Sequence, residues 1–242
     1  MNEHAWKQLN NLFIVACHAV YVAENFDDPF ADSSWYLLDY QDGEPPLYLE
    51  HIRQGVEIAH EDSDSLLIFS GGQTRFEAGP RSEAQSYWAI AEHFGWWEHR
   101  DVRLRSTTEE YARDSFENLL FGICRFRECV GKCPDRITVL SWGFKADRFD
   151  FHRGAIRFPE ERFTFLGVND PPNVEKAIQR DMKSAVEPFM KDPYGCGEFL
   201  SAKRRERNPF KRQHGYAFSC PELEELLRHQ GPELYQVRLP WD

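Results

Sequence analysis

The chain has 242 residues, with 29 basic and 40 acidic side chains and a formal net charge of -11. A protein that binds nucleic acid or an anionic membrane over a broad surface normally carries the opposite charge, so the net charge disfavours nucleic acid and membranes as main partners. Apolar residues make up 41% of the chain. No apolar run approaches the roughly 18 to 20 residues that a membrane span needs. The composition therefore predicts a globular protein with one large buried core.

The cysteines and the N-terminus indicate where in the cell the protein is expected. Six cysteines are too few for a disulfide framework in a chain of this length, and none forms a CxxC pair. Lys7 is offset by Glu3, and no small-residue cleavage site follows, so a secretory signal is not predicted. We expect a soluble cytoplasmic protein with reduced thiols, and a nuclear location stays open.

Strand and helix patterns alternate along most of the chain. In order, we expect a strand over 12–22, a helix over 47–60, a strand over 65–70, a helix over 82–94, a short strand over 102–104, a helix over 109–130, a strand over 136–142, a helix over 145–158, a strand over 162–168 and a helix over 173–189. This alternation predicts an α/β fold, a three-layer Rossmann-like and mainly parallel sheet with helices on both faces.

The last fifty residues differ in composition from the rest. We expect a Rossmann-like domain over 1–189 and a C-terminal extension over 190–242 that packs on or wraps the same domain. The extension is rich in Pro, Gly and charge, and a short helix is predicted only over 221–228.

Polar residues follow the predicted strands at the edge where open α/β sheets bind their ligands. His18 follows the first strand, and Ser70, Gly71, Gly72 and Arg75 follow the second. Paired glycines let the backbone turn tightly and aim its amides at an anion or a carbonyl oxygen. A plain tight turn is the alternative. A helix that begins at Ser82 would add the positive end of its dipole.

Two polar helix faces are candidate sites. Glu110, Asp114 and Asn118 recur at i, i+4 and i+8, so on the helix predicted over 109–130 they would form one stripe able to bind hydroxyls or position a general base. A solvated helix face is the alternative. The second face combines Lys145, Arg148 and His152 and would suit a phosphate or carboxylate, with a surface ion-pair face as its alternative.

The segment 203–212 contains six basic residues and one acidic residue. A run of this kind is typical of a solvated or self-neutralising tail. A nuclear-import or RNA-contact patch is the alternative interpretation.

Several motifs in order resemble the domain-of-unknown-function 218 family, the YdcF/SanA/ElyC-like group. They are Ile68-Phe69-Ser70-Gly71-Gly72, then Ser82-Glu83-Ala84, then Glu110 with Asp114-Ser115-Phe116-Glu117-Asn118. The resemblance covers about residues 12–170, and the extension looks closer to eukaryotic, fungal members. It implies a Rossmann-like fold with the charged motif residues at the strand ends. Bacterial members often carry His where this chain has Phe144 or Lys145, so an acid–base role is not carried over there.

The resemblance also implies a nucleotide-like ligand such as S-adenosylmethionine, and it leaves the reaction open. We therefore predict a domain that binds a small polar or anionic metabolite, with catalysis undecided. The alternatives are a hydrolase or transferase acting on a phosphorylated or glycosylated metabolite, and an interaction protein using residues 203–212. The catalytic candidates are Glu83, Asp114 and Glu110. The ligand-binding candidates are Ser70, Gly71, Gly72, Arg75, Ser82, Ser115, Asn118, Lys145, Arg148, His18 and His152. No metal ligands are predicted.

Overall fold

The computed structural model describes residues 6–242. Its centre is a five-stranded sheet in the order β5-β4-β1-β6-β7, in which all neighbours run parallel. The strands are β1 Asn11–Ala16, β4 Ser65–Ser70, β5 Ser106–Glu109, β6 Arg136–Ser141 and β7 Phe163–Gly167. β2 (Val20–Tyr21) and β3 (Trp35–Tyr36) form a separate antiparallel pair. The predicted α/β class with a mainly parallel sheet is confirmed.

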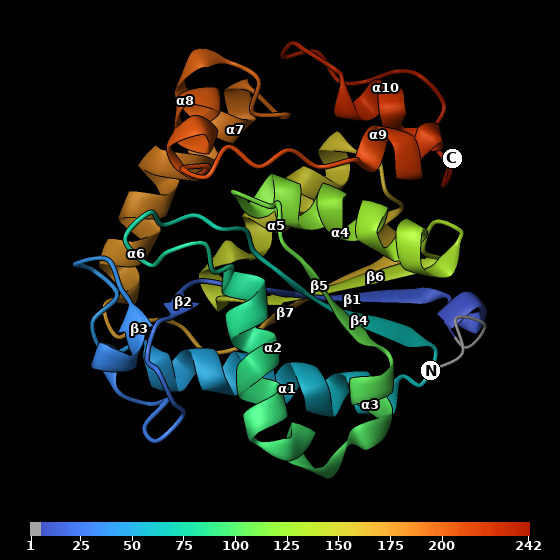
Figure 1. Ribbon diagram of the computed structural model, residues 1–242. Coiled ribbons are helices and arrows are strands. Elements are labelled where there is room, and N and C mark those ends of the chain that lie inside the picture. Colours follow the sequence, from blue (N-terminus) through green and yellow to red (C-terminus); the bar gives the residue numbers. More distant parts are fainter. Residues whose placement is uncertain (1–5) are drawn as a thin grey trace.

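Helices cover both faces of the sheet in three layers (Figure 1). One face carries α1 (Pro45–Glu61), α2 (Glu83–His93) and α3 (Arg100–Leu104), and the other carries α4 (Ser115–Val130) and α5 (Ala146–Ala155). β1 shows why a central strand is apolar throughout. Phe13 and Val15 belong to the core under α1 and α2, whereas Leu12 and Ile14 belong to the core under α4. Because strand side chains alternate, both faces must be apolar.

The extension lies outside the layer formed by α4 and α5 (Figure 1). α6 (Val174–Asp181) continues through a π-helical segment, Met182–Val186, into α7 (Glu187–Lys191). α8 (Glu198–Glu206), α9 (Tyr216–Ser219) and α10 (Glu224–Leu227) follow. Tyr216, Leu223 and Trp241 are buried in the same core as α4, so the extension shares that core. Short 3₁₀ turns occupy Trp6–Gln8, Asp32–Ser34, Gly95–Glu98, Gly143–Lys145, Glu160–Arg162 and Pro221–Leu223.

Several predicted boundaries are wrong. The strand expected over 102–104 belongs to α3, and the third strand of the sheet begins at Ser106. The helix expected over 109–130 begins at Ser115, because residues up to Glu109 pair with β4 and Asp114 caps the helix. The first strand ends at Ala16, well before residue 22. The stretch expected to be irregular contains α8.

No helix within residues 6–242 has the length and apolar character needed to cross a membrane.

Candidate functional site

A cavity of about 180 Å³ opens at the carboxyl ends of β1 and β6. The strand order reverses between these two strands, which is where open α/β sheets usually form a ligand crevice. Cys17 and His18 follow β1 into its wall, and Ser141 and Trp142 do so from β6. Pockets for drug-sized ligands commonly measure roughly 300–1,000 Å³, so the enclosed space suits a compact group.

The cavity wall carries a local excess of positive charge. It contains four acids against seven cations, and the cations are Arg75, Arg113, Lys145, Arg148, Arg180, Lys203 and Arg207. The acids are Glu44, Glu83, Asp114 and Asp181. This excess of three formal positive charges occurs in a chain of net charge -11. Crowded like charges repel one another, so the cavity favours an anion.

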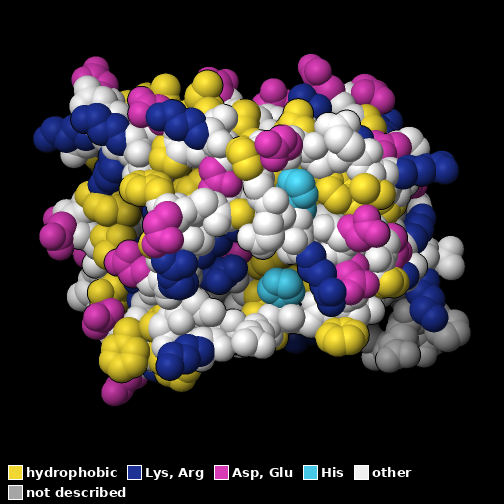
Figure 2. Space-filling model, turned by 90° about the horizontal axis from the view of Figure 1, so that it is seen from above, with side chains coloured by type: hydrophobic (Ala, Val, Ile, Leu, Met, Phe, Trp, Pro, Cys, Tyr) yellow, Lys and Arg dark blue, Asp and Glu magenta, His cyan; other side chains and the backbone are white. Residues whose placement is uncertain are grey.

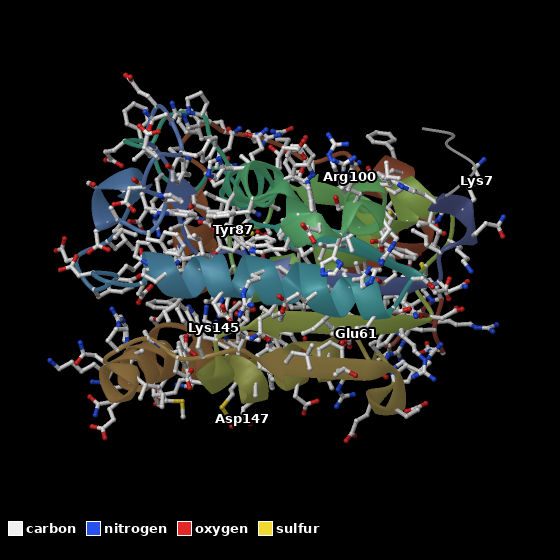
Figure 3. All side chains as sticks on the ribbon, turned by 90° about the horizontal axis from the view of Figure 1, so that it is seen from below. Lys7, Glu61, Tyr87, Arg100, Lys145 and Asp147 are labelled. Atoms are coloured by element: carbon white, nitrogen blue, oxygen red, sulfur yellow. The ribbon has the colours of Figure 1, made fainter. Side chains whose placement is uncertain are left out.

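Lys145 lies at the end of the turn between β6 and α5. Its ammonium group points between α1 and α5, whereas the exposed Asp147 lies at the outer edge of the molecule (Figure 3). Burial and the charge of Arg148 lower the pKa of Lys145 to about 7. Its Nζ lies 3.5 Å from Nδ1 of His18. Burial and the charge of Lys145 also lower the pKa of His18, so this imidazole is neutral at pH 7.

Three polar atoms in the cavity wall have no partner among the described residues: Nε2 of His18, Nε of Arg148 and the hydroxyl of Ser141. Arg148 is buried and pairs with Asp181 of α6, but its Nε makes no hydrogen bond. The buried hydroxyl of Ser141 is also without a partner. A buried polar group without a partner costs roughly 1–3 kcal/mol, so a ligand that bonded to these atoms would recover that free energy.

Glu83 is the carboxylate best placed for proton transfer. It is the first residue of α2, it lines the cavity, and its Oε1 accepts a hydrogen bond of 2.5 Å from the hydroxyl of Thr74. Burial raises the pKa of Glu83, and Thr74 and Arg75 offset that rise only in part. A raised pKa makes the Glu83 carboxylate a stronger base than an exposed glutamate.

Asp114 lines the same cavity, but its carboxylate oxygens are bonded to groups of the chain itself. Its Oδ1 accepts from the backbone amide of Glu117 at 3.0 Å, and Nε of Arg204 donates to its Oδ2 at 2.7 Å. Burial acts to raise the pKa of Asp114, but the Arg204 guanidinium outweighs burial and holds this pKa well below its usual range. A carboxylate stabilised in this way is a weak base, so the predicted catalytic role does not fit its environment.

Glu110 lies outside the cavity, in the loop between β5 and α4. Its Oε1 accepts from the hydroxyl of Thr108 at 2.8 Å, and Arg212 lies 3.7 Å from Oε2. The predicted stripe of Glu110, Asp114 and Asn118 is wrong, because the helix begins only at Ser115. Asn118 does line the cavity, and its Oδ1 accepts a hydrogen bond of 3.0 Å from Ser70.

Gly71 and Gly72 let neighbouring loops pack closely against the end of β4. The amide of Gly71 donates to the Glu109 carbonyl at 3.0 Å, and that of Gly72 donates to the Ala112 carbonyl at 2.8 Å. Both amides therefore have partners within the chain, and the prediction that they hold an anion is corrected. A Cβ at Gly72 would lie 2.6 Å from the Ala112 oxygen, so only glycine lets these loops approach so closely.

We expect Gly72→Ala to destabilise the protein by about 1–3 kcal/mol, because the added methyl group forces the backbone of Ala112 away. Urea unfolding followed by circular dichroism measures the change. Gly154→Ala is the matched control. Its Cβ would meet nothing within 4 Å inside α5, so we expect it to be neutral or to stabilise by up to about 1 kcal/mol. Equal unfolding midpoints for Gly72→Ala and the wild type would contradict this account.

Three further candidates have structural partners instead of facing the cavity. Ser82 caps α2 by accepting from the amide of Gln85 at 2.9 Å. Ser70 is buried and donates to Glu109 and Asn118. His152 is buried beneath α4, where its Nε2 lies 2.8 Å from the hydroxyl of Ser115. Of this pair, Ser115 lines the cavity and His152 does not.

Sequence reasoning missed the contribution of α8. Lys203 and Arg207 line the cavity, and the Arg204 side chain is only 13% exposed beside Asp114. The prediction of a solvated tail is therefore wrong for these residues. The available signal was the i, i+4 spacing of Lys203 and Arg207, which places these two residues on one side of a helix. Arg205, at 63% exposure, points away from that side.

One group of side chains in residues 6–242 could ligate a metal ion. His60, His99 and Asp101 place their ligand atoms within 4.8 Å of one another. His60 lies in the last turn of α1 and Asp101 in α3, at the opposite edge of the sheet from the cavity (Figure 1). Asp101 already pairs with Arg105 at 3.1 Å. This group has no connection with the candidate site.

Comparison with known proteins identifies one similar chain. An uncharacterized protein of Saccharomyces cerevisiae, YOR238W, is 29% identical, and the match covers 95% of this chain and 96% of the yeast protein. No protein-family profile matches the sequence. No solved structure matches it either.

Proposed function

We propose that the protein binds a small anionic metabolite in the cavity at the carboxyl ends of β1 and β6. The observation that carries this proposal is the excess of cations in the cavity wall of an acidic protein. Among these cations, Lys145 supports the proposal most directly, because no acidic side chain among the described residues forms an ion pair with its ammonium group. A ligand anion would supply the missing countercharge.

The resemblance to the YdcF-like group supports a nucleotide-like ligand. Within that class the cation-rich wall favours a phosphorylated nucleotide over S-adenosylmethionine, which carries a cationic sulfonium and no phosphate. The cavity of about 180 Å³ is small for a whole nucleotide and opens to solvent, so we propose that it holds the anionic part of such a ligand. Arg75 and Tyr40 also line the cavity and would contact the remainder.

A hydrolase or transferase acting on a phosphorylated or glycosylated metabolite is the second candidate. Glu83 favours it, because a half-buried carboxyl with a raised pKa beside an anion site fits a general acid or base. The proposal of an interaction surface at residues 203–212 has less support. Arg204 is paired with Asp114, and Arg207 and Arg212 bond to backbone carbonyls within the chain.

We expect Lys145→Gln to weaken binding of a compact anion at least tenfold, because one charge-assisted hydrogen bond contributes about 1.5–3 kcal/mol. Isothermal titration calorimetry with inorganic phosphate, acetate and adenosine monophosphate measures the affinity. Arg53→Gln is the control, since Arg53 pairs with Glu50 on the surface of α1. Failure of all three anions to bind the wild-type protein would overturn the proposed function.

The acid–base candidate needs a separate measurement. Glu83→Gln keeps the shape of the side chain and removes its proton chemistry. We expect anion affinity to stay within about threefold of wild type while any turnover of a phosphorylated or glycosylated substrate is lost. Turnover that persists in Glu83→Gln would exclude Glu83 as the base.

A further inference from the structure

We propose that the C-terminal extension completes the site, and that α8 makes it a site for a doubly charged phosphate group. This inference rests on the proposed anion-binding function and adds to it the class of ligand and the element that selects it. Lys203 lies in the last turn of α8, and Arg207 caps the helix at the next residue after its end. The Arg207 amide donates to the Lys203 carbonyl at 3.0 Å, so the two residues keep the i, i+4 spacing of one helix side, and both line the cavity. Figure 2 views the molecule from above and shows several Lys and Arg side chains left of centre, with Asp and Glu side chains among them.

The two cations of α8 are held in place but keep free hydrogen-bond donors. Nζ of Lys203 donates to the Ser184 carbonyl at 2.7 Å, and one terminal nitrogen of Arg207 donates to the Arg113 carbonyl at 2.8 Å. A lysine ammonium has three donors and a guanidinium has five. Neither side chain forms an ion pair with an acid in residues 6–242. Their remaining donors and their charges are therefore available to a ligand.

Lys203 and Arg207 lie close enough to Lys145 and Arg148, at the carboxyl ends of the strands, for the charges to repel one another. Burial, then Arg207 and Arg148, lower the pKa of Lys203 to about 8. The charges of Arg148 and Arg207 also lower the pKa of Lys145. Of these four cations, Arg148 is the one with an acidic partner in the described part of the chain. An anion bound among these four cations would reduce their mutual repulsion.

A phosphate monoester fits this group better than a carboxylate. It carries about -1.5 to -2 charges at neutral pH and three terminal oxygens, against one charge and two oxygens for a carboxylate. Two guanidinium groups can each bind it through paired donors, and two ammonium groups act as point charges. The cavity volume of about 180 Å³ accommodates a group of the size of a phosphate.

The ion pair between Arg204 and Asp114 positions α8, and no ligand takes part in it. Arg204 pairs with Asp114 at 2.7 Å and lies 3.3 Å from Glu117, both at the start of α4. The same guanidinium donates to the carbonyls of Tyr194 and Gly195. The extension is thus fixed to the rim of the sheet through Arg204, and Lys203 and Arg207 line the cavity beside it.

Calorimetric titration of the full chain with inorganic phosphate and with acetate, at pH 7.5 and matched ionic strength, tests the inference. We expect the wild type to bind phosphate at least tenfold more tightly than acetate. Lys203→Gln and Arg207→Gln should each weaken phosphate binding at least tenfold, and Arg207→Lys should recover part of the loss. Arg205→Gln is the matched control on the same helix and should leave both affinities unchanged, because Arg205 is 63% exposed and pairs with Glu198.

The outcomes separate the two proposals. Equal affinity for phosphate and acetate would overturn the inference and leave the anion site in place. Unchanged phosphate affinity in Lys203→Gln and Arg207→Gln, with a loss in Lys145→Gln, would do the same. If the wild type binds neither anion, the proposed function itself fails, and the inference fails with it. Circular dichroism shows whether each variant is folded. Lys203→Gln should fold, because it removes a repelling charge.

Discussion

Replacing Arg204 by Met is expected to lower the free energy of unfolding by about 3–5 kcal/mol. The ion pair of Arg204 with Asp114 has side chains only 13% and 11% exposed. Removal of the guanidinium would leave the carboxylate of Asp114 in a buried place without a countercharge. It would also leave the carbonyls of Tyr194 and Gly195 without that donor. Urea unfolding at pH 7.5 measures the difference.

The matched control for Arg204→Met is Arg205→Met, one residue further along α8. Arg205 and its partner Glu198 are 63% and 88% exposed, so water already screens their charges. We expect a change below about 1 kcal/mol. Similar destabilisation by the two variants would show that helix propensity or surface charge, and not the buried pair, accounts for the effect.

We expect His152 to make the protein sensitive to acid. Its side chain is fully buried, and burial followed by the charge of Arg148 lowers the pKa of His152 to about 3. An unfolded chain takes up the proton near pH 6.5, so stability is lost as the pH falls below that value. At pH 4.5 the loss from this group amounts to about 3 kcal/mol, or two pH units at 1.36 kcal/mol each.

The measurement compares the wild type with His152→Phe by urea unfolding at pH 7.5 and pH 4.5. Phe is chosen because Phe116 and Phe189 surround the ring, with centroids 5.6 and 4.6 Å away. His51, whose pKa burial lowers to about 4, contributes in the same direction, so the difference between the two proteins isolates His152. We expect the variant to lose about 3 kcal/mol less than the wild type on acidification. Equal losses would contradict a buried neutral His152.

Apolar run length and periodicity predicted the fold well. β4 and β6 occupy almost the ranges expected from their apolar stretches, because strands covered on both faces must be apolar at every position. α2 begins directly after Ser82 as expected, since that side chain bonds the amide of Gln85. The predictions around Glu110 failed. A strand end, a loop and a capped helix there carry polar side chains at helical spacing by coincidence.

Within the candidate site, position after a strand was the informative signal. It correctly brought His18, Arg75 and Lys145 to one cavity. It could not separate these from Gly71 and Gly72, whose amides bond to neighbouring loops. Whether a backbone amide is free depends on which carbonyl lies opposite, and that carbonyl belongs to a segment about forty residues away.

Residue pattern was enough to predict that this acidic chain forms a parallel α/β sheet with polar residues at the carboxyl ends of the strands. Hydrophobic periodicity is a local property, and the alternation of strands with helices favours parallel neighbours. The tertiary structure alone decided what the basic segment does. The charges of Lys203, Arg204 and Arg207 look like those of a solvated tail until α8 packs against α4. Burial then pairs one of them with Asp114 and turns the other two toward the cavity. Charge is encoded in the sequence, but its desolvation and its partners depend on contacts between distant segments.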